Sequence, residues 1–338
     1  MIKNFIILLY PFFIFFINFF FTKKNLIPNY SGDHHQKFFK KNNIQLTGGI
    51  FMIPIFSIIT FNYSIFLLVS LILIFLLGLS SDTGLFSSAK LRLLIQSFII
   101  LVFLIYSDTI LSSVRIKTLD ILLENYWFSL IFTLFCLMIL TNGTNFIDGL
   151  NGLVISYYIM ISLVILHLKL FEFSFLSKQD IIIVILIFTY LVLFNFFNKL
   201  YIGDSGSYLV GFLFGYILLQ IYENNLTFSP YFIAVLLWYP AFEIFFSIIR
   251  KIKINKSPLK PDNRHFHHLL FLFFDTKLRF SNNFINNLTS ITIIFYNILI
   301  FLIAIQNIYH TGLQVSLFSF NIIFYLILYY KLNQLKKS

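Results

Sequence analysis

The sequence predicts an all-α polytopic membrane protein, and three observations support this prediction. Of the 338 residues, 59% are hydrophobic and only 11% are charged, whereas soluble chains carry about 25% charged residues. Long apolar runs recur along the whole chain, as expected for helices that cross a bilayer. These runs are apolar on every face and lack the alternation that a transmembrane β-barrel requires. Both a soluble protein and a membrane β-barrel are therefore excluded.

The apolar stretches between polar breaks predict about eleven transmembrane helices within one domain, residues 1–338. No small-residue cleavage site follows the first stretch, which is therefore interpreted as a retained helix rather than a signal peptide. The shortest connection is a hairpin at Asn62-Tyr63. The predicted helices are 5–21, 50–61, 64–79, 93–106, 127–140, 153–168, 181–197, 208–221, 232–249, 291–308 and 313–330.

The distribution of basic residues predicts the orientation of these helices. Cytoplasmic loops of membrane proteins carry an excess of Lys and Arg. With the N-terminus outside and the C-terminus cytoplasmic, 19 of the 24 Lys and Arg residues fall in inside loops. Omitting the Asn62-Tyr63 hairpin would reverse every later loop and oppose this bias. The net charge of +11 then reflects membrane topology, and no nucleic-acid partner is expected.

Five polar clusters interrupt the apolar sequence, and the topology derived from charge places all five on the inside face. Their convergence on one face predicts a single site. Each cluster also has a structural alternative: a tight turn at Gly48-Gly49, a capping loop at 142–152, a helix cap at Asp204, or a solvated basic loop around the histidines. The clusters are 45–49, 78–82, 142–152, 203–207 and 261–268.

The side chains in these clusters indicate metal and phosphate chemistry. Isolated carboxylates and carboxamides occur beside a histidine group and without thiolates, and their hard oxygen ligands suit Mg²⁺ or Mn²⁺. Magnesium usually takes one or two protein carboxylates and fills its other positions with water and substrate phosphate. Sparse carboxylates beside basic loops therefore predict a phosphorylated substrate. Neither a P-loop nor a dinucleotide-binding fingerprint is present in the sequence.

A transporter or flippase for an anionic lipid-linked substrate is the alternative from another functional class. Such a protein would place ionisable groups near the bilayer centre, and only Glu243 approaches that position. Glu243 lies near the inside end of its predicted helix. We expect it to snorkel to the interface or to pair with Arg250.

Together the five clusters and their order resemble the polyprenyl-phosphate N-acetylhexosamine-1-phosphate transferases. This family includes the UDP-GlcNAc:undecaprenyl-phosphate GlcNAc-1-phosphate transferases and the related phospho-N-acetylmuramoyl-pentapeptide transferases. The resemblance covers about residues 37–270. Residues 142–153 resemble the family signature Asn-x-x-Asn-x-x-Asp-Gly-[Asp/Asn]-Gly-Leu, and residues 203–207 are similar to its Gly-Asp-x-Gly-[Ser/Ala] motif. Residues 265–268 resemble the His-Ile-His-His box of the N-acetylhexosamine branch better than the muramoyl equivalent.

The resemblance implies that a polyprenyl-phosphate oxygen attacks the β-phosphorus of a UDP-linked N-acetyl sugar and releases UMP. The product would initiate a cell-surface glycan at the cytoplasmic face of a bacterial plasma membrane. The sugar and the downstream pathway stay open, with GlcNAc as the default. The resemblance implies Asp204 as the metal ligand, Asp82, Asn145, Asp148, His267 and His268 as catalytic residues, and Lys41, Asn142, Asn151, Arg264 and His265 as substrate-binding residues.

One position departs from the family pattern. The first aspartate motif usually contains an Asp-Asp pair, and here it reads Ser81-Asp82. Either Asp82 takes over part of the role of the pair, or the protein is a catalytically weakened member of the family. A lipid phosphate already carries nucleophilic oxygens at neutral pH, so it needs charge neutralisation more than deprotonation. The interpretation as an enzyme therefore stands, and the identity of the base stays open.

Overall fold

Helices form nearly all of the regular structure. The computed structural model describes residues 2–27, 44–86, 88–107, 109–257 and 264–335. Within these ranges the two short strands, β1 (Gln45–Leu46) and β2 (Leu200–Tyr201), pair in parallel. The helices are α1 (Ile2–Lys24), α2 (Gly48–Thr60), α3 (Ile65–Asp82), α4 (Ala89–Ser107), α5 (Lys117–Leu123), α6 (Tyr126–Ile147), α7 (Leu153–His167), α8 (Lys178–Phe196), α9 (Gly203–Glu223), α10 (Pro230–Lys253), α11 (Phe266–Leu278), α12 (Asn282–Ala304) and α13 (Thr311–Leu335).

Each apolar stretch predicted from the sequence coincides with a helix, although several boundaries differ; α12, for example, begins at Asn282 rather than at residue 291. Eight of the described helices are long and apolar enough to cross a membrane, namely α3, α4, α6, α8, α9, α10, α12 and α13. The apolar helices α2 and α7 are shorter, with 13 and 15 residues. The all-α polytopic membrane fold is therefore confirmed. The count of eleven crossings and their orientation stay predictions.

The hairpin predicted at Asn62-Tyr63 is present. Helix α2 ends at Thr60 and α3 begins at Ile65. The backbone N–H of Leu67 donates to Ser64 Oγ, which caps the start of α3. This turn gives α2 and α3 opposite directions, as the charge-derived topology requires.

Several helices extend further into the polar clusters than hydropathy predicts. Helix α3 continues to Asp82, α6 continues to Ile147, and α9 already begins at Gly203. Hydropathy marks where contact with lipid ends, whereas the backbone hydrogen bonds of a helix continue into its polar end. The short helices α5 and α11 and the paired strands were not predicted. Cluster residues 78–82, 142–147 and 203–207 therefore lie in the ends of helices.

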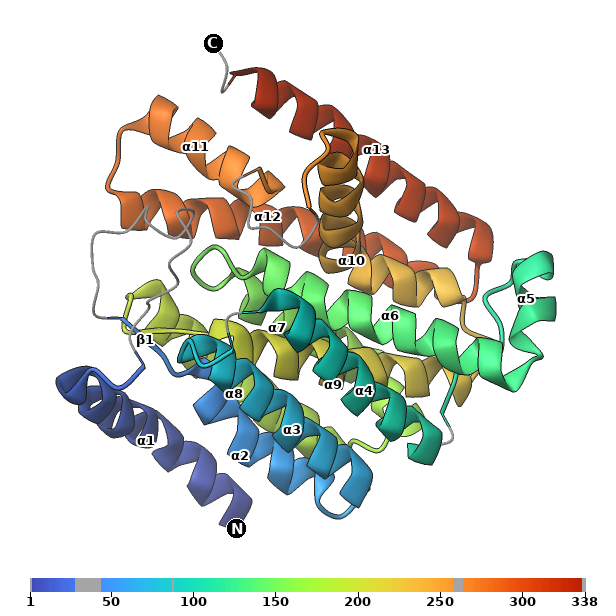
Figure 1. Ribbon diagram of the computed structural model, residues 1–338, viewed down its shortest axis with the longest axis horizontal. Coiled ribbons are helices and arrows are strands. Elements are labelled where there is room, and N and C mark those ends of the chain that lie inside the picture. The colour runs from blue at the N-terminus through green and yellow to red at the C-terminus, as the bar shows by residue number, and fades with distance from the viewer. Residues whose placement is uncertain (1, 28–43, 87, 108, 258–263, 336–338) are drawn as a thin grey trace.

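Helix α9 lies at the centre of the bundle (Figure 1). Its side chains are buried from 205 to 222, and its most extensive packing is against α6 and α3. Packing between membrane helices depends on small residues that allow close approach. A Cβ on Gly211 would lie 2.8 Å from Thr141 Cα of α6. The small-residue pair Gly211 and Gly215 thus packs against a helix of the same chain.

The polar helix ends meet at one end of the bundle, near β1 at the left of Figure 1. A Cβ on Gly49, in α2, would lie 2.5 Å from Ser205 Oγ in α9. The end of α3 also contacts the start of α9 through Asp82. The segment after α6 contacts α11, where a Cβ on Gly149 would lie 2.4 Å from His267 Nε2. Segments far apart in the sequence thus assemble one polar region.

Gly78 should be essential for the packing of α3 against α9. A Cβ at this position would lie 2.4 Å from Ser205 Cα, a backbone atom that can move only if the helices separate. We expect Gly78→Ala to destabilise the protein by about 1–3 kcal/mol and to lower its melting temperature in detergent. As a control, Gly312→Ala places its Cβ 3.2 Å from the side chain of His310 and should leave the melting temperature nearly unchanged. Equal melting temperatures for wild type and Gly78→Ala would contradict this account.

Candidate active site

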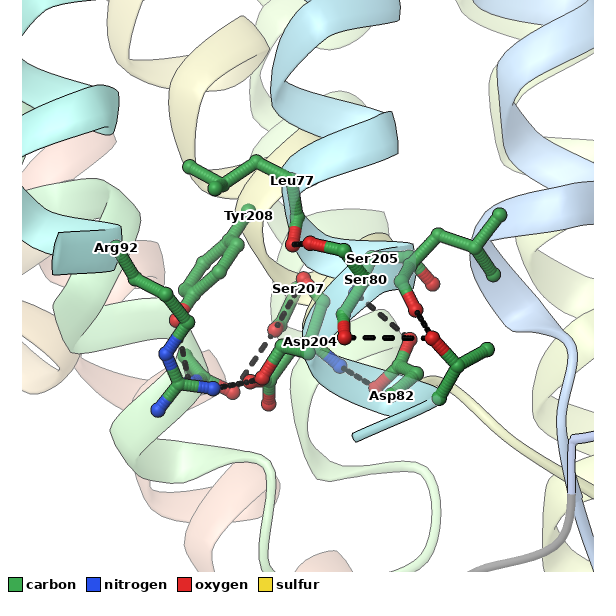
Figure 2. A network of polar contacts seen from close by, with 12 residues as sticks. Leu77, Ser80, Asp82, Arg92, Asp204, Ser205, Ser207 and Tyr208 are labelled. Atoms are coloured by element: carbon green, nitrogen blue, oxygen red, sulfur yellow. Dashed lines mark hydrogen bonds and ion pairs between the residues drawn. The ribbon is translucent and has the colours of Figure 1, made fainter. Parts of the chain in front are cut away.

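The first turn of α9 lies at the centre of the polar region. Gly203 starts this helix with φ of +72°, a left-handed conformation that favours glycine. The Asp82 carboxylate accepts hydrogen bonds from the backbone N–H groups of Asp204, at 2.8 Å, and Ser205, at 3.0 Å (Figure 2). The first N–H groups of a helix have no partner within the helix and attract anions. Asp82 therefore caps α9 from a neighbouring helix, a contact that the sequence did not predict.

Asp204 projects from this turn toward two donors. Its Oδ2 accepts a hydrogen bond from Ser81 Oγ at 2.5 Å. The same oxygen forms an ion pair with Arg92 Nη1 at 3.0 Å (Figure 2). Its side chain is 26% exposed. The alternative in which Asp204 caps a helix starting near Tyr208 is wrong, because α9 already begins at Gly203. Arg92 was not among the predicted site residues, although it follows the first aspartate motif closely.

Asp148 follows α6 directly and lies close to the other two carboxylates. Burial, and then the negative charges of Asp204 and Asp82, raise the pKa of Asp148 well above its ordinary value. A hydrogen bond from the Gly203 backbone offsets part of this effect. The three carboxylates thus form a group whose negative charges repel one another, and Arg92 pairs with one of them. Such a group attracts protons or cations.

The carboxylates of this group suit the coordination that a magnesium ion requires. Among the residues that the structure describes, no three His, Cys, Asp or Glu side chains form a preassembled metal site. Magnesium usually requires only one or two protein carboxylates, because substrate phosphate and water complete its coordination. Asp204, partly exposed and close to Asp148, fits this requirement.

Asn145, in the last turn of α6, faces the first turn of α9. Its Oδ1 accepts a hydrogen bond from Ser207 Oγ at 3.0 Å. Its Nδ2 lies 3.4 Å from the Tyr208 hydroxyl. The structure therefore places this predicted catalytic residue beside the helix turn that carries Asp204.

Asn142 and Asn151, both predicted to bind substrate, are tied to other parts of the protein. Asn142 Nδ2 donates to Gln96 Oε1 of α4 at 2.7 Å. Asn151 Nδ2 donates to Asn198 Oδ1, just after α8, at 2.8 Å. Both asparagine side chains are buried. These contacts favour a structural role, and substrate binding by either residue stays a prediction.

His265, His267 and His268, here called the histidine row, lie beside the carboxylates at the start of α11. All three are buried, and the rings of His265 and His267 stack with centroids 5.6 Å apart. A Cβ on Gly149 would lie 2.4 Å from His267 Nε2 and 3.0 Å from His268 Nε2. Both Nε2 atoms therefore lie against the residue that follows Asp148. The alternative of a solvated basic loop is wrong for these side chains, because they pack inside the protein.

The structure describes only some of the predicted basic site residues. Lys41 and residues 261–263 lie outside the described residues. Arg264 is exposed, and its carbonyl accepts a hydrogen bond from Arg250. The sequence did not single out Lys251, which is buried with its Nζ 5.7 Å from the centre of the Phe146 ring. Its neighbours Arg250 and Lys253 lie in the same last turn of α10, so the sequence did not distinguish Lys251 from them.

The predicted pairing of Glu243 with Arg250 is wrong. Glu243 instead contacts His265 Nδ1 at 2.9 Å and accepts a hydrogen bond from the Tyr325 hydroxyl at 2.8 Å. Arg250 lies two turns further along α10 and donates to the Tyr329 hydroxyl. The two side chains therefore face different groups despite their nearness in sequence.

Comparisons with known proteins agree with the motifs. Residues 64–222 match the family model described as glycosyl transferase family 4. A Bacillus subtilis protein named probable undecaprenyl-phosphate N-acetylglucosaminyl 1-phosphate transferase is 29% identical over 195 residues, covering 55% of this chain and 52% of that protein. A Thermotoga maritima protein named undecaprenyl-phosphate alpha-N-acetylglucosaminyl 1-phosphate transferase is 27% identical over 134 residues, covering 38% and 39% of the two chains.

A Mycobacterium leprae protein named decaprenyl-phosphate N-acetylglucosaminephosphotransferase is 29% identical over 166 residues, covering 42% of this chain and 41% of that protein. The chain thus spans about half the length, or less, of the curated relatives that it matches. The family resemblance predicted from the sequence motifs is confirmed.

The raised pKa of Asp148 predicts how stability depends on pH. The Asp148 carboxyl holds its proton more tightly in the folded than in the unfolded state. The free energy of unfolding therefore falls as pH rises from the ordinary pKa of aspartate through the higher pKa of folded Asp148. Since asparagine does not ionise, Asp148→Asn should melt at a higher temperature than wild type at neutral pH. We also expect a smaller loss of melting temperature between about pH 5 and pH 8.

The measurement is thermal unfolding of the detergent-solubilised protein across this pH range. Glu124→Gln, which removes an exposed carboxylate on the connection after α5, serves as the control and should follow wild type. Identical pH slopes for Asp148→Asn and wild type would contradict the assigned effect.

Proposed function

We propose that this chain, whose residues 64–222 match the family model described as glycosyl transferase family 4, transfers an N-acetylhexosamine-1-phosphate to polyprenyl phosphate. The donor is a UDP-linked N-acetyl sugar, and UMP is released. The observation that carries this proposal is the meeting of Asp82, Asp148 and Asp204 with the histidine row at the polar end of a membrane bundle. A lipid acceptor cannot leave the bilayer, whereas a nucleotide sugar is water-soluble. A site at the ends of membrane helices can reach both.

Asp204 is the proposed ligand for Mg²⁺ or Mn²⁺, with Asp148 close by. The ion, when bound, supplies positive charge that offsets the repulsion between lipid phosphate and diphosphate. The rigid first turn of α9 holds Asp204 in place. Asn145 holds the facing end of α6 through Ser207. These residues keep the metal-binding carboxylates in a fixed geometry.

Donor side chains around the carboxylates suit phosphate oxygens. The Arg92 guanidinium and the imidazoles of His267 and His268 line the same region and can form charge-assisted hydrogen bonds to phosphate. Each Asp82 oxygen already accepts a backbone N–H, so we propose that Asp82 acts by holding Asp204 in place. Its role in activating the lipid phosphate stays a prediction.

UDP-GlcNAc is the first donor to test, because the named relatives include N-acetylglucosamine-1-phosphate transferases. The acceptor would be undecaprenyl or decaprenyl phosphate. The proposed location is the plasma membrane of a bacterium, with the polar end of the bundle facing the cytoplasm. This orientation follows from the positive-inside distribution of Lys and Arg.

The decisive experiment measures UMP release by purified protein supplied with polyprenyl phosphate and a panel of UDP-N-acetyl sugars, with and without Mg²⁺. Asp204→Asn should abolish metal-dependent release while the protein remains folded in detergent. Glu223→Gln is the matched control, because it removes a carboxylate at the opposite end of α9 and should retain activity. Full activity of Asp204→Asn would refute the metal assignment, and absence of release from folded wild type with every donor would refute the function.

Ser81 offers a second test of the metal site. Its Oγ lies 2.5 Å from Asp204 Oδ2, and two ionised carboxylates that close require a proton or a cation between them. Ser81→Asp should therefore bind Mg²⁺ more tightly, so that half-maximal UMP release occurs at a lower Mg²⁺ concentration. Ser81→Ala should not show this shift. An unchanged or weaker Mg²⁺ dependence in Ser81→Asp would argue against a metal at Asp204.

A further inference from the structure

Glu243 is a buried carboxylate outside the group formed by Asp82, Asp148 and Asp204. It lies within the apolar helix α10, and its exposed fraction is 0%. A buried ionised group is costly unless it is paired and hydrogen-bonded. The proposed chemistry gives this residue no direct contact with substrate. Its presence therefore requires another explanation.

Three groups converge on the two oxygens of Glu243. Oε1 contacts His265 Nδ1 at 2.9 Å and accepts the backbone N–H of Phe266 at 3.3 Å. Oε2 accepts the Tyr325 hydroxyl at 2.8 Å. These contacts join α10 to the start of α11 and to α13. All three are satisfied together when Glu243 is an ionised acceptor and each partner donates to it.

This arrangement determines the proton position on His265. If Nδ1 carries the proton that is donated to Glu243, Nε2 lies on the opposite edge of the ring, away from the carboxylate. A carboxylate bonded to one ring nitrogen fixes the tautomer and the orientation of a histidine. The bond from Phe266 N–H also caps the start of α11. One side chain thereby fixes both the ring and the helix that carries the rest of the histidine row.

The ring of His265 in turn contacts the family signature. It lies edge-on to Phe146, with ring centroids 5.2 Å apart, and it stacks on His267. His267 and His268 lie against Gly149 through their Nε2 atoms. The histidine row therefore meets the 146–149 segment at two places, Phe146 and Gly149. A shift of His265 would move both contacts.

We propose that Glu243 is a positioning residue for the transfer reaction, a role that rests on the proposed function. It holds His265 as the Nδ1–H tautomer and aligns the histidine row with the segment around Asp148. Tyr325 supports Glu243 from α13 through its hydroxyl. Neither residue touches the reacting phosphates.

Two buried tyrosines provide a matched test. Tyr325 and Tyr239 are 2% and 1% exposed, and replacing either by phenylalanine removes one hydroxyl. The Tyr325 hydroxyl donates to Glu243, whereas the Tyr239 hydroxyl, one turn before Glu243 on α10, has no hydrogen-bond partner among the described residues. Tyr325→Phe should lower kcat for UMP release, and Tyr239→Phe should not. Glu243→Gln should lower kcat further, by about 10- to 100-fold, as when a carboxylate that orients a ligating histidine is removed.

The position of the proton on the His265 ring can be measured independently of enzyme activity. Nitrogen NMR of protein with ¹⁵N-labelled histidine, with His265→Gln to assign the resonance, reports which ring nitrogen carries the proton. We expect an Nδ1–H tautomer in wild type and Tyr239→Phe, and a changed resonance in Glu243→Gln and Tyr325→Phe. If Glu243→Gln does not fold, the two tyrosine variants decide the question.

The outcomes separate this inference from the proposed function. An unchanged His265 resonance in Glu243→Gln, or in Tyr325→Phe if the former does not fold, overturns the inference. Equal losses of activity in Tyr325→Phe and Tyr239→Phe also overturn it, since they would reflect packing alone. A changed resonance with full UMP release refutes the positioning role. If folded wild type releases no UMP from any donor, the proposed function fails, and the role of Glu243 in transfer fails with it. The His265 resonance then still tests the contact between Glu243 and His265.

Discussion

The hydrogen bonds between the Asp82 carboxylate and the first turn of α9 hold the centre of the site together. Helix α9 is buried along almost its whole length, so its leading N–H groups depend on protein partners to satisfy them. Asp82 supplies that partner from the last residue of α3. The position of α9 along α3 is thereby fixed. Asp204 is consequently held within reach of Ser81 and Arg92.

The start of α11, the second helix that carries site residues, is capped in the same way. Helix α11 begins against Glu243 of α10, which accepts the Phe266 N–H, as α9 begins against Asp82. In both places a carboxylate from one helix satisfies the start of another, where the helix dipole favours negative charge. Two of the acidic residues thus organise helix ends. Asp204 and Asp148 are left as the carboxylates proposed for metal and phosphate chemistry.

Ser81 changes the charge balance of the site. An aspartate at this position, as the family pattern leads one to expect, would place a further carboxylate beside Asp204. Ser81 instead donates a hydrogen bond to Asp204 Oδ2, and Arg92 adds a positive charge to the same oxygen. Repulsion within the group is lower than with an Asp-Asp pair, because one anion is replaced by a donor. At this position Asp204 therefore has a hydroxyl and a guanidinium as partners.

Hydropathy predicted the helical membrane fold and the Asn62-Tyr63 hairpin, and the motifs predicted the family resemblance and the segments that carry the polar residues. Hydropathy and motif order are local properties of the chain, so they can be read without coordinates. The packing of the helices was needed to show that Asp82 caps α9 and that Glu243 pairs with His265 rather than Arg250. It was also needed to show that Asn142 and Asn151 contact other parts of the protein. These partners come from distant segments: Asp82 and Asp204 are 122 residues apart. Such contacts depend on how helices pack side by side, and the residues nearest in sequence, such as Arg250 two turns from Glu243, point to other groups.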